Sequence, residues 1–385
     1  MNKKNYLTIL IALIILASAY CAYAYLTNDD STVPASDLVI APNNITPTKA
    51  PAPAPIEEPT SITVVDGIGN TVTIPLPVTR IAALDGSIVE TLCVMGVQNL
   101  IVARCETTVM PPSILNVPSV GQTDSVPNVE AIIALEPDVI FASTMLSVGN
   151  SAAYTQFENA GIPVYIVNMS IPEPSGPSKM TKDELYNSQT SIDFICGLMQ
   201  KLTPIVGHQE QVTAYIDWVQ PYNQLLKDRI YALPSDQQVT VFLEWYSIPY
   251  RTIVTMGIPQ AGGINIAENQ DIYMPTLAPE FVVEQNPSVI IEMFSNPAHD
   301  INDFINAKNN VLSRDIFNDV DAIKNERVYI LEWSARNGVR SVVGYLYMAK
   351  WIHPDLFLDI DPAAVNQELN QKFYGDNING TFGYP

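Results

Sequence analysis

The chain has 385 residues, 47% of them apolar, and a formal net charge of −21. This length allows two or three domains with well-packed cores. Because the 19 Lys and Arg residues are spread along an acidic chain, the composition excludes a nucleic-acid-binding role, which needs a basic face. The acidic balance indicates a protein that stays soluble outside the cell.

The N-terminal segment is apolar enough to cross a membrane. Residues 6–26 contain no charge, two lysines precede them and two aspartates follow. This charge order places the N-terminus inside and the rest of the chain outside. Residues 22–24 also match a signal-peptide cleavage site, so residues 1–28 are either a signal peptide or a retained membrane anchor. Lipidation of Cys21 is a third alternative.

Residues 29–60 form a linker rich in Pro, Thr and Ala, with seven prolines after residue 30. Such a composition predicts a semi-extended tether between a membrane and a folded domain. Glycosylation triplets begin at Asn44, Asn168 and Asn379, and they agree with an external location.

Beyond the linker, short apolar runs alternate with amphipathic segments. Residues 61–74 predict a hairpin with a Gly-rich turn. The predicted strands are 80–84, 100–103, 139–142, 164–167, 239–243 and 328–331. The predicted helices are 88–95, 152–159, 340–352 and 362–374. This alternation predicts parallel sheets that are covered by helices on both faces.

One sequence pattern occurs twice, about 150 residues apart. In each copy a Glu stands seven residues before a Pro, apolar residues fill the interval, and a Val-Ile run follows the Pro. The two Glu residues are Glu130 and Glu280. The pattern predicts a short helix that is broken at the Pro and leads into a buried parallel strand. Two copies therefore indicate two similar α/β lobes.

Residues 181–235 carry a purely helical pattern. Pro204 and Pro221 interrupt this pattern, which predicts one helix to about Leu202 and a second, longer helix from about Gln209 that is kinked or broken near Pro221. Its place between the two copies makes this segment a candidate rod that joins two lobes.

The cysteine and histidine residues do not predict a metal site. Cys93 and Cys105 either form a disulfide bridge or remain buried thiols. The three histidines, His208, His299 and His353, are widely separated, whereas a bare-metal site needs two or three imidazoles with a carboxylate. The chain also lacks GxSxG, GxxxxGK[ST] and HExxH signatures, so the common hydrolase and nucleotide-binding motifs are absent from the sequence.

Several segments in order resemble one known family. They are SITVVDGIGNTVTIPLPVTRIAAL, PNVEAIIALEPDVIF, FLEWYSIPYRT, AGGINIA, APEFVVEQNPSVII and NERVYIL. Over about residues 61–374 the chain closely resembles the substrate-binding proteins of ABC importers for cobalamin, ferric siderophores and related metal chelates. The resemblance implies an α/β fold with two Rossmann-like lobes, each with a parallel sheet, joined by a single long helix, which is the class III periplasmic-binding-protein fold.

The N-terminal composition and the resemblance together predict a domain organisation. Its parts are a signal peptide or membrane anchor, a linker, an N-terminal lobe, an interlobe helical segment, a C-terminal lobe and a tail. Their ranges are 1–28, 29–60, 61–180, 181–235, 236–375 and 376–385.

In function, the resemblance implies a monomeric binding protein without catalysis or cofactor. It would work on the extracellular face of the cell membrane, either tethered to the membrane or secreted into the periplasm. It would capture a metal chelate or a corrinoid and deliver it to an ABC permease dimer with its ATPase. Glu130 and Glu280 would dock on the permease, although a carboxylate in a first helical turn can simply complement the helix dipole. A ligand-sensing or scaffold ectodomain with the same fold is the alternative function.

The expected ligand site lies at the carboxyl ends of the strands, where open α/β sheets bind ligands. Aromatic rings there could stack on a chelate, hydroxyls could bind it, and arginines could bind its carboxylates, whereas core packing or a solvated surface position is the alternative for each. Asp85 departs from the Ser-Pro that relatives often carry at its position. The candidate ligand-binding residues are Asp85, Ser87, Ser143, Trp245, Tyr246, Arg251, Trp333 and Arg336.

Overall fold

The computed structural model describes residues 59–167, 191–230, 233–234, 237–245, 249–253, 257–270, 274–295, 300–375 and 378–385. The predicted apolar segment 6–26 and residues 29–58 of the predicted linker lie outside the described residues, as do Asn44 and Asn168. Within the described ranges, no helix is both long and apolar enough to cross a membrane.

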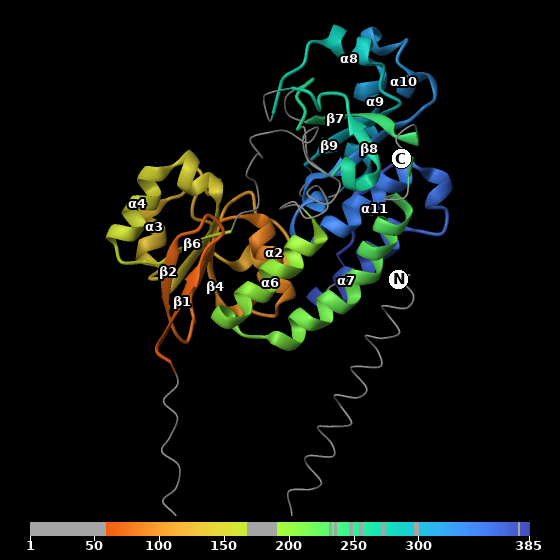
Figure 1. The fold of residues 1–385 in the computed structure, drawn as a ribbon. Helices are drawn as coiled ribbons and strands as arrows, with labels where there is room; N and C mark the ends of the chain where they lie inside the picture. The colour runs from red at the N-terminus through yellow and green to blue at the C-terminus, as the bar shows by residue number, and fades with distance from the viewer. Residues whose placement is uncertain are drawn as a thin grey trace, which may run out of the picture. The chain divides into compact units, whose positions relative to one another are not determined.

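The strands and helices alternate along the chain (Figure 1). The strands are β1 Ser61–Val65, β2 Thr71–Pro75, β3 Ile81–Ala83, β4 Ile101–Arg104, β5 Val139–Ser143, β6 Val164–Val167, β7 Val239–Trp245, β8 Gly263–Asn265, β9 Val289–Phe294, β10 Val328–Glu332 and β11 Gly383–Tyr384. The α-helices are α2 Gly86–Val94, α3 Val129–Ala134, α4 Ser151–Asn159, α6 Ile192–Val206, α7 Gln209–Ile230, α8 Pro279–Gln285, α9 Ile301–Leu312, α10 Asp321–Lys324, α11 Ser341–Ile352 and α12 Pro362–Leu369.

The first lobe is built on a parallel sheet with the strand order β4-β3-β5-β6. Successive residues of its strands enter opposite cores, because side chains alternate between the faces of a sheet. Val139 and Phe141 face the helices α2 and α6, whereas Ile140 and Ala142 face the core beneath α3 and α4. Every residue of β5 is buried, as a strand covered on both faces requires.

The second lobe repeats this design with the strand order β11-β10-β9-β7-β8. β7 to β10 are parallel, and β11 adds an antiparallel edge in which Gly383 pairs with Leu331. The segment after residue 376 therefore contributes a short strand to the second sheet. The parallel α/β lobes agree with the predicted fold class.

The repeated sequence pattern has the same structure in both lobes. α3 leads into β5 and α8 leads into β9, and the residue before each Pro turns the chain with a positive φ: 46° at Glu136 and 42° at Asn286. The predicted helix, its break at the Pro and the buried parallel strand are confirmed.

α6 and α7 carry the chain from the first lobe to the second (Figure 1). α6 continues past Pro204 to Val206, and α7 is one 22-residue helix that contains Pro221. The second helix begins at Gln209 as predicted, and the first ends at Val206, four residues beyond the predicted Leu202. Neither Pro204 nor Pro221 breaks its helix. An internal proline costs about 3 kcal/mol, and the apolar faces that both helices bury in the core offset this cost.

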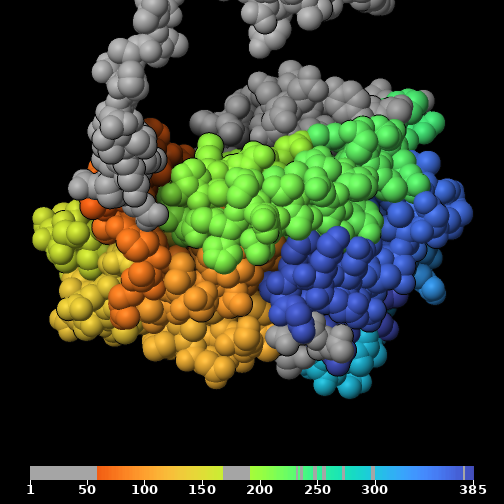
Figure 2. Space-filling model, turned by 90° about the horizontal axis from the view of Figure 1, so that it is seen from below, coloured from red at the N-terminus to blue at the C-terminus, as the bar shows by residue number. Residues whose placement is uncertain are grey.

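A hydrophobic core runs across both lobes. It includes Phe141 of the first sheet, Leu243 and Ile291 of the second, and buried side chains of α2, α6, α7 and α11. Figure 2 shows α6 and α7 as a continuous green band that lies against both the first lobe and the C-terminal elements of the second. The lobes therefore share buried apolar surface instead of being connected only by a linker.

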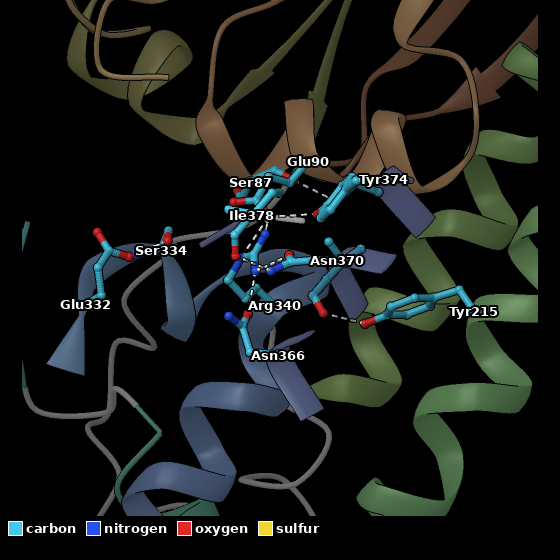
Figure 3. Close-up of polar contacts among 12 residues, drawn as sticks. Ser87, Glu90, Tyr215, Glu332, Ser334, Arg340, Asn366, Asn370, Tyr374 and Ile378 are labelled. Carbon is cyan, nitrogen blue, oxygen red and sulfur yellow. Dashed lines mark hydrogen bonds and ion pairs between the residues drawn. The ribbon is translucent and has the colours of Figure 1, made fainter. Parts of the chain in front are cut away.

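A buried ion pair also joins the lobes (Figure 3). Arg340, which precedes α11, is fully buried, and its guanidinium donates to Glu90 of α2 at 2.9 and 3.1 Å. Its remaining nitrogen, Nη1, donates to Asn366 and Asn370 at 2.5 and 2.9 Å. The Tyr374 hydroxyl donates to the same Glu90 oxygen at 2.8 Å. The charges are thus satisfied within the fold.

The described cysteines, Cys93, Cys105 and Cys196, are free and buried. Of the two alternatives for Cys93 and Cys105, the buried thiols are confirmed. Burial raises the pKa of the Cys93 thiol to about 12, and the neighbouring charge of Glu90 adds to the shift. These thiols are therefore protonated and unreactive at neutral pH.

The substitution Arg340→Met should lower the free energy of unfolding by about 3–5 kcal/mol, because it leaves the Glu90 carboxylate buried without its partner. Urea unfolding of the purified protein measures this value. The double variant Arg340→Met/Glu90→Met should recover part of the loss, since no buried charge then remains uncompensated.

Lys324→Met is the matched control. Lys324 pairs with Asp319 at 3.3 Å, but both side chains are at least half exposed, so its loss should change stability by less than about 1 kcal/mol. Equal losses in the Lys324 and Arg340 variants would contradict the role assigned to the buried pair.

Candidate ligand-binding site

A pocket of about 350 Å³ lies between the lobes, at the carboxyl ends of the strands of both sheets. Its walls come from the loops after β3 and β4 in the first lobe and from the ends of β7, β9 and β10 in the second. The lining residues are Leu84, Asp85, Gly86, Ser87, Glu90, Thr107, Thr108, Val109, Met110, Thr123, Asp124, Trp245, Ser295, Glu332, Trp333, Ser334 and Asn337.

Asp85 begins the first-lobe wall. It stands between β3 and α2, where it caps the helix by accepting from the backbone N–H groups of Ser87 at 2.9 Å and Ile88 at 3.3 Å. The Ser87 hydroxyl donates to the same oxygen, Oδ1. The requirement to cap α2 therefore fixes the orientation of this carboxylate in the pocket wall.

Asp124 contributes a second carboxylate from the loop before α3. Its Oδ2 accepts from the backbone N–H of Ser143 at 3.1 Å and also from the Ser143 hydroxyl. Ser143 ends the buried strand β5, and it is not among the lining residues. The serine thus acts behind the wall, where it orients Asp124.

The second-lobe wall carries two tryptophans. The rings of Trp245, at the end of β7, and Trp333, directly after β10, lie 4.3 Å apart at an angle of 53°. The backbone N–H of Trp245 donates to the backbone carbonyl of Arg251 at 2.8 Å, which fixes the end of the strand. The guanidinium of Arg336 lies 3.3 Å from the centre of the Trp333 ring and restrains that ring from behind.

Glu332, which directly precedes Trp333, lies beside Ser334 (Figure 3). A serine holds it in the same manner as Asp85 and Asp124. Its Oε2 accepts from the Ser334 N–H at 2.5 Å and from the Ser334 hydroxyl. Its side chain comes from the last residue of β10, so strand geometry directs it to the pocket.

Burial perturbs two of the lining acids. It raises the pKa of Asp124 to about 6, assisted by the charge of Asp85 and opposed by the hydrogen bonds from Ser143. Burial likewise raises the pKa of Glu332 to about 7, opposed by the hydrogen bonds from Ser334. Strongly perturbed acids in a cleft are typical of functional sites.

The structure brings four of the predicted ligand-binding residues into the pocket wall: Asp85, Ser87, Trp245 and Trp333. Ser143, Arg251 and Arg336 lie outside the lining. Ser143 bonds to Asp124 and Arg336 lies on the Trp333 ring, whereas Arg251 contacts Trp245 through its backbone carbonyl. Tyr246 lies outside the described residues.

Sequence reasoning missed Glu90, Asp124, Glu332 and Thr108. Glu332 could have been found, because it directly precedes Trp333 at a strand end. Glu90 lies within the apolar pattern of α2, and Asp124 lies in a polar loop, so neither carries a local signal. Among the described residues, no group of His, Cys, Asp and Glu side chains is arranged to hold a metal ion.

The predicted docking residues lie on exposed surface away from the pocket lining. Glu130 is in the first turn of α3 and Glu280 is in the first turn of α8, and both side chains are exposed. They occupy equivalent positions on the two lobes.

The substitution Glu332→Gln should flatten the dependence of stability on pH. A carboxyl whose pKa rises on folding from 4.5 to about 7 stabilises the folded state at acidic pH, and this contribution is lost as the pH rises through about 7. Melting temperatures of the ligand-free protein between about pH 5 and pH 8 should therefore fall less in the variant than in the wild type. The exposed control Glu284→Gln should keep the wild-type slope; an unchanged slope in Glu332→Gln would contradict the assignment.

Comparisons with known proteins agree with this architecture. A family model described as periplasmic binding protein matches residues 81–334, more than half of the chain. The molybdate-binding protein MolA of Haemophilus influenzae is 23% identical over 282 residues, which cover 69% of this chain and 74% of MolA. A cobalamin-binding protein of Halobacterium salinarum is 24% identical over 251 residues, or 62% of this chain and 58% of that protein.

The fold comparison gives the same result. The solved structure of the Haemophilus influenzae MolA bound to molybdate matches with a TM-score of 0.68 at 19% sequence identity, covering 83% of this chain and 99% of the MolA chain. The family match, the two parallel-sheet lobes and the pocket between them lead to one conclusion: this chain belongs to the periplasmic binding protein family.

Proposed function

We propose that the chain is the extracellular substrate-binding component of an ABC importer, and that it captures a metal chelate, such as a ferric siderophore or another iron complex, or a corrinoid. The observation that carries this proposal is the pocket between the lobes, whose wall includes the paired rings of Trp245 and Trp333. Flat aromatic surfaces suit a macrocycle or a chelate, because they provide a large contact area with few conformational degrees of freedom. The cobalamin-binding relative supports this choice of ligand class.

The pocket volume limits how the ligand is held. About 350 Å³ is near the lower end of the range for small-molecule sites. The pocket therefore encloses a compact chelate or one face of a larger one. The function requires binding and release only, so no residue is assigned a catalytic role.

Glu130 and Glu280 are the proposed contacts with the permease. Each is an exposed carboxylate in the first turn of a short helix, and the two helices are equivalent elements of the two lobes. A permease dimer presents the same surface twice, so equivalent carboxylates on two lobes match its two-fold symmetry. In this arrangement the N-terminal segment and the linker keep the binding protein near the membrane.

Replacement of the cleft tryptophan should weaken both binding and fluorescence quenching. The substitution Trp245→Ala should raise the Kd about tenfold for whichever of ferrioxamine B, ferrichrome, cobalamin or haem the wild type binds, because it removes a large contact surface. Titration of intrinsic fluorescence measures both quantities, and Trp245→Phe should retain affinity while it reduces the quench.

Trp351→Phe is the matched control. Trp351 stacks on Tyr329 in the core at 4.9 Å and lies outside the pocket lining. It should keep the wild-type quench and affinity; equal losses in the Trp245→Phe and Trp351→Phe variants would place the ligand elsewhere.

Charge reversal at the two docking positions should separate transport from binding. The double variant Glu130→Lys/Glu280→Lys should lose uptake of radiolabelled ligand in cells that carry the cognate permease, because charge reversal disrupts the two proposed contacts with the permease. Its Kd should equal that of the wild type, since neither residue lines the pocket.

A control with the same change in net charge is Glu158→Lys/Asp355→Lys, at exposed positions on the two lobes. It should transport normally. Loss of ligand affinity in the docking variant, or equal loss of uptake in the control, would refute the docking assignment.

A further inference from the structure

The charged side chains in the pocket wall are all acidic. Asp85, Glu90 and Asp124 come from the first lobe and Glu332 from the second, whereas no described residue of the lining is Lys, Arg or His. The pocket thus combines negative charge from both lobes, and a ligand between them meets it from both sides.

Serine side chains orient these carboxylates without neutralising them. Asp85, Asp124 and Glu332 each use one oxygen to accept both the N–H and the hydroxyl of a serine. Such neutral donors hold a carboxylate in place but leave its charge. The second oxygens of Asp85 and Glu332 have no hydrogen-bond partner among the described residues, so they remain available to a ligand.

The arginines near the pocket are engaged with other groups. Arg340 pairs with Glu90. Glu90 is therefore the one lining acid whose charge is compensated by an arginine among the described residues. Arg104 donates to the carbonyls of Ile114, Cys105 and Thr108 behind the first-lobe wall. Arg336 lies on the Trp333 ring. The charges of Asp85, Asp124 and Glu332 therefore have no ion-pair partner among the described residues.

Two further features of the wall suit a ligand with N–H donors. Thr108 is 2% exposed and lines the pocket, and its buried hydroxyl oxygen has no hydrogen-bond partner among the described residues. A buried hydroxyl without a partner is costly unless a ligand or water completes it. The Trp245 and Trp333 rings add negative π-faces, which attract cations.

We propose that this pocket selects ligands that carry positive charge, namely chelates with a protonated amine or with a net positive charge. The proposal refines the function proposed above and depends on it for the location of the site. Asp85 and Glu332 would bind the cationic group from opposite lobes, and the Thr108 hydroxyl would accept one of its N–H groups. An oxyanion such as molybdate, or an anionic chelate, would instead face repulsion from both walls.

Three ferric chelates separate charge from shape. Ferrioxamine B and ferrichrome both hold iron through hydroxamates, but the first bears a protonated amine and the second is neutral, whereas ferric enterobactin is anionic. Titration calorimetry of the full chain with these probes, with molybdate and with spermidine, a cation without metal, compares their affinities. Ferrioxamine B should bind at least about tenfold more tightly than ferrichrome, because hydrogen bonds to charged groups are the strong ones.

The variants Asp85→Asn and Glu332→Gln test the carboxylates. Asparagine caps a helix as well as aspartate does, so the first variant removes charge while it preserves α2. Each variant should weaken ferrioxamine B about tenfold and change ferrichrome by less than about threefold. Asp361→Asn is the matched control at an exposed cap of α12, and it should leave every affinity unchanged.

Each outcome decides a different point. Tighter binding of ferrichrome, ferric enterobactin or molybdate than of ferrioxamine B would overturn the cation preference and leave the function as a binding protein intact. If Asp85→Asn and Glu332→Gln weakened ferrichrome as much as ferrioxamine B, the cation preference would also be overturned. Binding of spermidine, with no binding of any of the three chelates, would support the cation preference and refute a chelate as the ligand. Failure of all five probes to bind would count against both the cation preference and the proposed function.

Discussion

The ion pair between Glu90 and Arg340 is the interaction on which the rest of the structure depends. It joins α2 of the first lobe to the segment before α11 of the second, and the Arg340 side chain is fully buried. Removing two charges from water is costly, so the pair is favourable only because Asn366, Asn370 and Tyr374 complete its hydrogen bonds. That requirement ties the C-terminal helices to the first lobe and fixes the relative position of the two pocket walls.

A fixed position of the lobes has a consequence for binding. The apolar core continues from the first sheet through α6 and α7 to the second, so separation of the lobes would expose buried apolar surface as well as the ion pair. The pocket is therefore largely formed before the ligand arrives, and preorganisation reduces the cost of binding. Selectivity then depends on the side chains that line the wall and on their charge, more than on closure of the lobes.

The sequence allowed much of the fold to be predicted but only part of the site. The repeated pattern works as a signal because its Pro and its apolar spacing are local, and Glu136 and Asn286 turn the chain identically before each Pro. The two helices were predictable, but their continuity through Pro204 and Pro221 was not, because it depends on tertiary packing, which no local pattern reports. In the pocket, Trp245 and Trp333 stand at strand ends and were predictable. Asp124 and Thr108 reach the pocket through loops, whose course depends on long-range contacts.

The lining acids link ligand charge to protonation. In the empty pocket, burial raises the pKa of Asp124 to about 6 and that of Glu332 to about 7, so the protein avoids some of the cost of holding buried negative charges close together. A cationic ligand reverses this balance, because a nearby positive charge favours the ionised carboxylates. Binding of such a ligand is then coupled to proton release, and its affinity rises with pH across the range in which these acids titrate. An anionic ligand would show the opposite dependence, since it requires the same groups to remain protonated.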